Sequence, residues 1–493
     1  MASSSTQNAS PGRLWTGRLA LPVSLGLLLI ILALPLPGLA TSGQIVLGIL
    51  AMAVLLWITE ALDYPVSALL IAALMALLLG LIPDSKTGVV LGTSKAIGLA
   101  MKGFASTGIV MITGALIMAS AMQSTGLDRR IALAILSRVR PNTSAILAGC
   151  LSIGMALSFI VPSPTGRTAV QVPILAGLVN SLGMSDKSRL SAILMIGAAQ
   201  VSTVWNVGVM TATVHNIAGL ELMAEHSGFT ITWARWLLYA APWSLLMTMI
   251  LFVILRREMA GHSINGAAAT LVTGNREPMT ARQKRLAMYS ALLLVLWITE
   301  GMLHHISVPA SMLMMAVALL LPGVGVFDSW KELEKRLPWG VLIMFGVSIS
   351  LGQQLVSTGA AAWLAEACFS SQSFQSMPLV LLIFAMTLFT TIMHLGFASA
   401  MSLTVALLPV FLAIVDTLPD SMAAYSMSLV LLQLFAVSFG MILPVNAPQN
   451  MLAYSTDSFD TRTFARIGVQ LTIASLALFT LFSVTWWRWT GLL

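Results

Sequence analysis

The chain has 493 residues, of which 58% are hydrophobic and only 9% are charged. A transmembrane helix needs about 20 mainly apolar residues, and such stretches follow one another along almost the whole chain. The formal net charge is +7, but in such a protein the positions of Lys and Arg report topology before ligands. This composition excludes soluble enzymes, nucleic-acid-binding proteins and single-anchor receptors, and it predicts an all-α polytopic membrane protein. The two cysteines, Cys150 and Cys368, are too few for a disulfide framework or a cysteine-rich metal site.

The N-terminal segment, residues 1–18, is rich in Ser, Asn and Gly, and we expect it to be disordered and cytoplasmic. An apolar run from Leu19 to Ala40 follows. We interpret this run as a retained first span, 19–43. The alternative is a cleaved signal peptide, because Gly38 and Ala40 are small residues of the kind that a signal peptidase requires.

Further apolar runs predict ten more spans, near residues 44–60, 64–82, 104–125, 190–221, 232–255, 286–301, 308–326, 338–358, 421–454 and 466–490. Two other long apolar stretches, 143–182 and 378–412, carry an interruption of Pro, Gly and Ser residues near the middle. Such a pattern is typical of a helical hairpin that enters the membrane and returns to the same side. The sequence therefore predicts about 11 transmembrane helices and two re-entrant hairpins.

The positions of Lys and Arg set the expected orientation. With a cytoplasmic N-terminus, most of the 25 Lys and Arg residues lie on the cytoplasmic side, as membrane proteins prefer. We therefore expect a cytoplasmic N-terminus, a basic cytoplasmic linker at 257–285 and an external C-terminus.

Repeated landmarks indicate that the chain consists of two related halves, 44–256 and 286–490. The landmarks are Leu-Trp-Ile-Thr-Glu at 56–60 and 296–300, Ser-Thr-Gly at 124–126 and 357–359, and a serine ten residues before a proline, Ser163 and Ser399. An odd number of predicted spans separates corresponding points, so the halves are expected to have opposite orientations. Inverted repeats with interrupted helices are typical of secondary transporters, whose sites lie at the repeat interface.

Four interruptions lie at membrane depth in this scheme: 162–166, 211–216, 394–401 and 444–450. Irregular backbone is tolerated there only where it is buried in protein or lines a wet cavity. Half-helix N-termini present free N–H groups to an anion, and free carbonyl groups hold a cation. Each interruption alone is equally consistent with a proline kink, but two symmetric pairs predict a binding site.

Residues 163–168, which read Ser-Pro-Thr-Gly-Arg-Thr, resemble the hairpin-tip signature of the divalent anion/sodium symporter family, which carries dicarboxylates, citrate and sulfate. Residues 444–450 resemble the second unwound motif of that family. Residues 126–133 and 211–222 are similar to stretches of its bacterial citrate, tartrate and dicarboxylate exchanger branch. The resemblance covers about residues 44–490.

The resemblance implies that each half supplies a scaffold part and a transport part. It also implies a homodimer joined through the scaffolds and an elevator movement of the transport part. The resemblance and the residues at the interruptions together give the residues that we expect to bind substrate: Ser163, Pro164, Thr165, Arg167, His394, Ser399, Ala447, Pro448 and Asn450. The expected cation or coupling set is Thr213, His215, Asn216, Ala400 and Asn446.

Two departures from the family pattern bear on coupling. Pro164 stands where the first tip of the family has Asn, and Ala400 and Met401 stand where the second has Asn and Thr. An amide oxygen is a good ligand for a hard cation, whereas Pro and Ala side chains offer no ligand. The departures favour exchange or proton coupling over sodium coupling.

Arg167 follows Ser163 by one helical turn and so shares its face. A charged side chain at membrane depth costs about 2.5–3.5 kcal/mol and is functional by default, and a guanidinium binds a carboxylate or sulfonate with two parallel hydrogen bonds. The alternative is that Arg167 reaches the cytoplasmic interface or pairs with the scaffold. His394 and His215 lie at interruptions, where histidine can bind an anion or carry a proton. For both histidines the alternative is a neutral ring satisfied by the backbone.

These features predict a secondary transporter, not an enzyme, for a small divalent organic anion such as a C4-dicarboxylate or a citrate-like anion. Importing a dianion against an interior-negative potential costs about 4.6 kcal/mol per 100 mV, so uptake needs an exchanged anion or a coupling ion, Na⁺ or H⁺. No other cofactor and no metal are expected. The expected partners are the substrate, the lipid of a bacterial inner membrane and a second copy of the chain, with no nucleic acid.

Two alternatives remain at this stage. The first is a transporter of sulfate or of a sulfonated or inorganic anion, because the resemblance includes such substrates. The second, a remote one, is an intramembrane hydrolase that uses Ser163 or Ser399 with His215 or His394. A serine nucleophile needs a base and an oxyanion hole, and no matching sequence motif is present.

Overall fold

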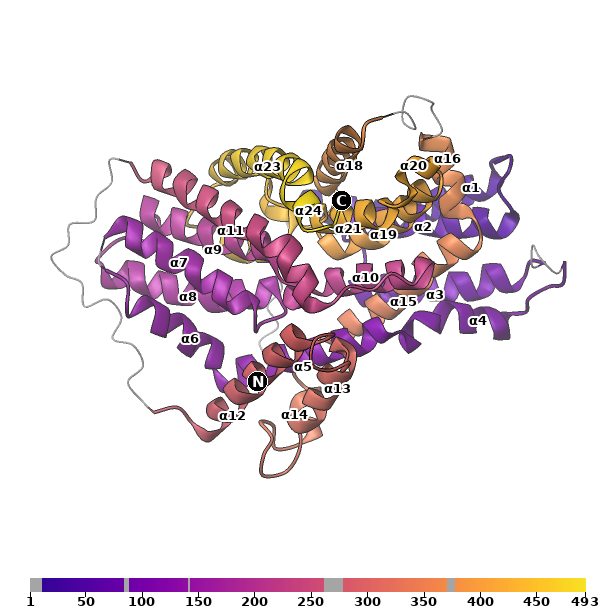
Figure 1. Ribbon diagram of the computed structural model, residues 1–493. Coiled ribbons are helices and arrows are strands. Elements are labelled where there is room, and N and C mark those ends of the chain that lie inside the picture. The colour runs from indigo at the N-terminus through magenta and orange to yellow at the C-terminus, as the bar shows by residue number, and fades with distance from the viewer. Residues whose placement is uncertain (1–10, 84–87, 141, 261–277, 370–376) are drawn as a thin grey trace. The chain divides into compact units, whose positions relative to one another are not determined.

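The computed structural model describes residues 11–83, 88–140, 142–260, 278–369 and 377–493 (Figure 1). Helices joined by short loops make up this part of the chain, which contains no extended β-strand. The predicted all-α class is therefore confirmed. The described helices form two compact units, one from the described residues of 11–106 and 339–369 and the other from those of 107–338 and 377–493.

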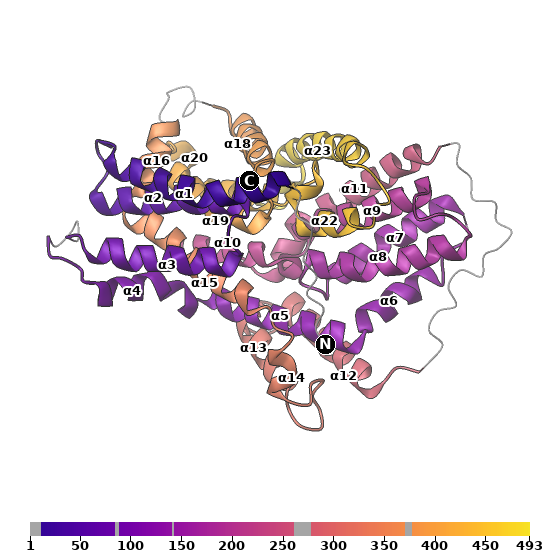
Figure 2. The same cartoon turned by 180° about the vertical axis from the view of Figure 1, so that it is seen from behind.

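The first unit contains α1 (Pro11–Ala33), α2 (Thr41–Thr59), α3 (Tyr64–Gly80), α4 (Thr93–Met101), the 3₁₀ turn η1 (Lys102–Ala105), α15 (Trp339–Ser357) and α16 (Ala360–Phe369). Helix α15 packs against α3, α4 and η1. Both views show it beside α3 and α4 (Figures 1 and 2). The amide of Gly103 in η1 donates to Ser350 Oγ in α15 at 2.8 Å. A Cβ atom on Gly103 would overlap the carbonyl oxygen of Gly346, so only glycine permits this close backbone packing.

The second unit begins with the helices that follow η1. They are α5 (Thr107–Thr125), α6 (Leu127–Leu136), α7 (Thr143–Ser158), α8 (Pro164–Ser181), α9 (Arg189–Gly208), the 3₁₀ turn η2 (Met210–Ala212), α10 (Val214–Ser227), α11 (Trp233–Glu258), α12 (Ala281–Thr299), α13 (Val308–Ala318) and α14 (Trp330–Glu334). Helices α7, α8, α9 and α11 form one packed group (Figures 1 and 2).

The C-terminal part of the chain completes this unit. Its elements are α18 (Leu379–His394), α19 (Ala400–Asp416), α20 (Asp420–Ala423), α21 (Ser426–Ala436), the 3₁₀ turn η3 (Pro444–Asn446), α22 (Pro448–Tyr454), α23 (Thr461–Val484) and α24 (Trp486–Trp489). Helices α7 and α8 form the first helical hairpin and α18 and α19 the second, as the sequence predicted. The predicted interruptions in 190–221 and 421–454 are present as α9–η2–α10 and α21–η3–α22.

Within the described residues, six segments are long and apolar enough to cross a membrane: α2, α5, α9, α11, α15 and Thr461–Trp489. Four other predicted spans contain shorter apolar helices, at Leu19–Ala33, Tyr64–Gly80, Val308–Ala318 and Ser426–Ala436. The predicted span 286–301 lies in α12, which has 19 residues but begins with the charged residues Arg282, Lys284 and Arg285. Leu238, Leu245, Met249 and Val253 recur at helical spacing on α11, and all four are exposed. A continuous apolar stripe of this kind is suited to lipid, which agrees with a polytopic membrane protein.

Several elements differ from the expected layout. Helix α1 begins at Pro11, inside the segment 1–18 that we expected to be disordered, while residues 1–10 lie outside the described residues. Helices α4, α6 and α14 occupy stretches that the sequence left as connections. These helices are short or carry charged residues, so they lack the long apolar run by which spans are found. Of the predicted linker 257–285, residues 261–277 also lie outside the described residues.

The duplicated pentapeptide forms the same local structure twice. Trp57 Nε1 donates to Ser67 Oγ at 3.2 Å between α2 and α3, and Trp297 Nε1 donates to Ser311 Oγ at 2.9 Å between α12 and α13. In each unit the second helix of this pair packs against a helix from the other half of the sequence, α3 against α15 and α13 against α5. This agreement supports an internal duplication.

Candidate functional site

The two hairpin tips have the same backbone form but different capping. Ser163 (φ −148°, ψ 114°) is the N-cap of α8, and Ser399 (φ −147°, ψ 125°) is the N-cap of α19. Ser163 Oγ accepts a hydrogen bond from Gly166 N at 3.1 Å, and Pro164 has no N–H at the first helical position. Ser399 makes no side-chain cap bond. The second tip therefore offers more free N–H groups to an anion.

The two interrupted helices restart with matching geometry. Thr213 (φ −152°, ψ 149°) precedes α10, and Ala447 (φ −155°, ψ 143°) precedes α22. Both residues follow a 3₁₀ turn of three residues, η2 or η3. Such repeated dihedral angles show that the two interruptions are equivalent structures and not independent proline kinks.

An asparagine stabilises each interruption by the same pattern of bonds. Asn216 Nδ2 donates to the carbonyl oxygens of Asn206 and Val209, at 2.8 and 3.4 Å. Asn450 Nδ2 donates to those of Gly440 and Leu443, at 2.9 and 3.4 Å. In both cases the acceptors lie ten and seven residues before the asparagine. Both Oδ1 atoms are buried and have no hydrogen-bond partner among the described residues.

Arg167 is fully buried and connects the first tip to the first interrupted helix. Its Nη1 donates to the carbonyl oxygens of Val161 and Ala212 at 2.9 and 2.7 Å. Its Nη2 donates to Ser202 O at 2.9 Å and to Asn206 Oδ1 at 2.7 Å. The four terminal N–H groups are thus used within the protein. In this conformation Arg167 holds the tip in place and leaves only Nε without a partner.

Asn446 and His394 connect the second tip to the second interrupted helix. Asn446 Nδ2 donates to the carbonyl oxygens of His394 and Phe397 at 2.8 and 3.3 Å, and Oδ1 accepts from Leu443 N at 3.0 Å. The His394 ring lies with Nε2 3.3 Å from the carbonyl oxygen of Asn446. A Cβ atom on Gly440 would come within 2.6 Å of His394 Nε2, so this position requires glycine.

Two buried polar bridges join the interrupted helices to each other. His215 Nδ1 bonds Thr213 Oγ1 at 2.8 Å, and His215 Nε2 bonds Ser438 Oγ at 2.9 Å. In the opposite direction, Gln449 Nε2 donates to Thr203 Oγ1 at 3.0 Å. His215 and Gln449 both occupy the second helical position, in α10 and α22. Helix α8 also packs against α22, and α10 against α19, so the four helix starts lie in one region.

The predicted site residues divide by exposure. The partly exposed or exposed ones lie at helix starts: Ser163, Pro164, Thr165, Ser399, Ala400 and Pro448. The buried ones hold the tips and interruptions together: Arg167, Thr213, His215, Asn216, His394, Asn446, Ala447 and Asn450. Sequence reasoning missed Gln449, Thr203, Ser438 and Asn206. Only Gln449 lay inside a recognised motif, and the other three are polar residues near the ends of apolar runs, with no local signal.

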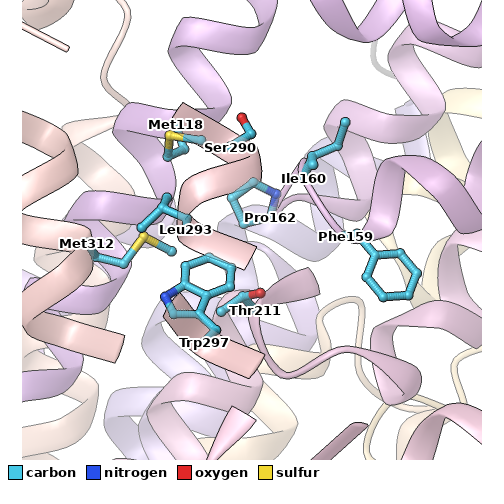
Figure 3. Close-up of a pocket in the computed structure, with 9 residues that line it drawn as sticks. All are labelled: Met118, Phe159, Ile160, Pro162, Thr211, Ser290, Leu293, Trp297 and Met312. Carbon is cyan, nitrogen blue, oxygen red and sulfur yellow. The ribbon is translucent and has the colours of Figure 1, made fainter. Parts of the chain in front are cut away.

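A small apolar pocket lies on one side of the first tip (Figure 3). Pro162 and Thr211 line it together with Leu293 and Trp297 of α12. Its volume of about 20 Å³ is enough for little more than one water molecule. Thr211 Oγ1 also accepts a hydrogen bond from Trp233 Nε1 at 3.2 Å. The first tip is therefore closed on this side.

A much larger cleft of about 810 Å³ opens on another side of the same hairpin. Its walls are the end of α5 with Gln123, the start of α6 with Arg129, and the face of α8 with Gly166 and Ala169. Gly166 belongs to the first turn of α8, directly after the tip. The cleft thus extends as far as the first turn of α8, next to the first tip.

The chain is similar in sequence and in fold to known membrane proteins. The profile of a family described as the sodium:sulfate symporter transmembrane region matches residues 14–493. A membrane protein of Cupriavidus necator is 42% identical, over 94% of this chain and 91% of that protein. The sodium-dependent dicarboxylate transporter SdcS of Staphylococcus saprophyticus is 26% identical, over 93% and 89%. The YdaH transporter of Alcanivorax borkumensis has a similar fold, with a TM-score of 0.57 and 15% identity over 88% of this chain and 99% of that one.

Proposed function

From the premise that the chain belongs to the sodium:sulfate symporter family, we propose that this membrane transporter carries small divalent organic anions. The proposed substrates are a C4-dicarboxylate or a citrate-like anion. A relative named a sodium-dependent dicarboxylate transporter, 26% identical to this chain, supports this substrate class. Family membership already excludes an enzyme as the main interpretation.

One structural observation carries the proposal. Two hairpin tips and two interrupted helices lie in one unit, joined by Arg167, by Asn446 and by the His215 and Gln449 bridges. The uncapped start of α19 supplies N–H groups and the positive end of a helix dipole for one carboxylate. The proposed substrate contacts are Ser163, Thr165 and Ser399 at the tips, because these side chains remain partly exposed.

We propose that the buried residues act by positioning rather than by direct contact. Arg167 has its four terminal N–H groups on protein acceptors. His394 and Asn446 hold the second tip in the same way. The Oδ1 atoms of Asn216 and Asn450 are buried acceptors without a partner in the described residues, and they are the proposed ligands of a coupling cation or proton donor.

The proposed mechanism is alternating access by an elevator-type movement in a homodimer, with the two halves of the sequence as inverted repeats. Coupling is proposed to be exchange with an internal anion, with cation coupling as the alternative. Exchange is favoured because the tips lack the amide side chains that would bind sodium at Pro164 and Ala400. It also avoids the cost of about 4.6 kcal/mol per 100 mV for net import of a dianion.

Uptake of labelled succinate into proteoliposomes tests this proposal. Vesicles preloaded with unlabelled succinate are compared with empty vesicles, each with and without a sodium gradient. Exchange predicts uptake that requires internal succinate and does not depend on sodium. Uptake into empty vesicles that is driven by sodium contradicts exchange and supports cation coupling. Uptake of sulfate in place of succinate contradicts the proposed substrate class.

A further inference from the structure

Two charged residues line the cleft between α6 and α8, the exposed Arg129 and the buried Asp128. The guanidinium side chain of Arg129 is exposed and forms no ion pair within the described part of the chain. The neighbouring Asp128 is only 2% exposed, and its Oδ1 accepts from Arg129 N at 2.7 Å, so this carboxylate is engaged at the start of α6. The solvent-facing charge at this point of the cleft is therefore positive.

A second polar side chain, that of Gln123, lies in the cleft near the first tip. Gln123 lines the same cleft, and its Nε2 lies 3.6 Å from the position that a Cβ atom on Gly166 would take. Gly166 N is itself bonded to Ser163 Oγ at the tip. An amide donor thus stands directly beside the first turn of α8. Arg129 and this amide donor therefore line the same cleft, and the donor lies next to the first turn of α8.

The remaining walls of the cleft are largely apolar. They include Leu133 on α6 and Val170, Pro173 and Ile174 on α8. A cleft with apolar walls and exposed charge of one sign focuses the electric field and raises the local concentration of counter-ions. Here the exposed charge is that of Arg129, because Asp128, which also lines the cleft, is only 2% exposed. Its volume of about 810 Å³ exceeds what a small dicarboxylate needs. The volume, charge and position of the cleft together suit a site at which an anion binds before it reaches the tips.

We propose that this cleft is an anion-binding vestibule for carboxylate dianions, in which Arg129 attracts the anion and Gln123 passes it to the first tip. The inference rests on the proposed transport of divalent anions and adds a second site to it, in front of the tips. The vestibule determines which charge of solute reaches the tip from the α6 side.

Chemical modification of a thiol in the cleft tests the inference without transport. Ala169 on α8 is exposed and lines the cleft, so Ala169→Cys is introduced in a Cys150→Ser, Cys368→Ser background. The rates of reaction with an anionic and with a cationic methanethiosulfonate reagent are then compared. Arg129→Gln is expected to lower the ratio of anionic to cationic rate by roughly 3- to 10-fold at low salt. At high salt the effect disappears because the field is screened.

Arg138→Gln is the matched control. Arg138 follows α6 and is also basic, but its guanidinium donates to Ala134 O at 2.7 Å and does not line the cleft. This variant is expected to leave the ratio of the two reaction rates unchanged. In proteins that retain Arg129, succinate is expected to slow modification of the thiol. An unchanged ratio in Arg129→Gln, an equal fall in Arg138→Gln, or no protection by succinate would each overturn the vestibule.

The experiments distinguish failure of the proposed transport function from failure of the proposed vestibule. If the rate ratio depends on Arg129 and succinate protects the thiol, but no vesicle takes up succinate, the vestibule is supported and dicarboxylate transport is contradicted. If the protein exchanges succinate but the ratio of anionic to cationic reaction rates is the same with and without Arg129, the transport function is supported and the vestibule is contradicted.

Discussion

At the scale of single residues, most buried charged and polar side chains of this site form hydrogen bonds within the protein and hold the tips and interruptions together. Arg167 illustrates the point. Sequence reasoning placed it at the tip and offered either substrate binding or an internal pairing, and the structure shows its terminal N–H groups on four protein acceptors. The sequence could locate the arginine but not its acceptors, because three of the four belong to Ser202, Asn206 and Ala212, which lie 35 or more residues away in the chain.

Arg167→Ala is therefore expected to lower stability first. The substitution leaves four buried acceptors without a donor, each at a cost of about 1–3 kcal/mol before relaxation. We expect a fall in apparent Tm of more than about 5 °C, measured by thermal unfolding in detergent. Arg138→Gln at the surface serves as the control. A variant with wild-type Tm and greatly weakened succinate binding would instead give Arg167 a direct substrate contact.

At the scale of helices, the most informative feature is the pair of bridges between the interrupted helices. His215 reaches Ser438, and Gln449 reaches Thr203. The interruptions themselves were predictable, since Pro, Gly and Asn residues divide otherwise apolar runs. The bridges were not, because their hydroxyl partners are ordinary residues of buried helices. Two equivalent helix starts that hold each other in this way are expected to move as one body.

Ser438→Ala and Thr203→Val test the bridges with little change of shape. Each substitution leaves a buried nitrogen without its partner, so each is expected to destabilise the protein by about 1–3 kcal/mol and to slow succinate exchange. Ser455→Ala, which removes a hydroxyl bonded to Leu452 O at an exposed position, is the control. Stability and exchange rates equal to the control in both variants would show that the bridges have no role.

At the scale of the whole molecule, the fold class, both hairpins and both interruptions were predicted from hydrophobic patterning. The amphipathic helix α6 and the early start of α1 at Pro11 were not. Patterning detects long apolar runs and their breaks, whereas α6 mixes Arg129 and Arg130 with apolar residues. The larger cleft is partly formed by α6, so this cleft could not be predicted from the sequence.

An elevator movement predicts that some contacts within the described conformation must break during transport. One such contact joins α10 to the start of α5, where Thr107 N and Thr107 Oγ1 donate to the carboxylate of Glu221 at 3.1 and 2.6 Å. A disulfide formed between Thr107→Cys and Glu221→Cys, in a background without Cys150 and Cys368, is expected to abolish succinate exchange. Reduction is expected to restore it. Full exchange in the crosslinked protein would exclude relative movement of these two helices.

The central claim is that the start of α19 in the second tip binds the anion. Ala400→Pro removes one N–H there, and the extended backbone of Ser399 before it suits a following proline, as at Ser163 and Pro164. The direct measurement is the Kd of succinate for purified wild-type protein and for this variant. The account predicts a Kd about 10-fold higher in the variant, with unchanged Tm, since a hydrogen bond to a charged group contributes about 1.5–3 kcal/mol. Equal affinities in the two folded proteins would contradict it.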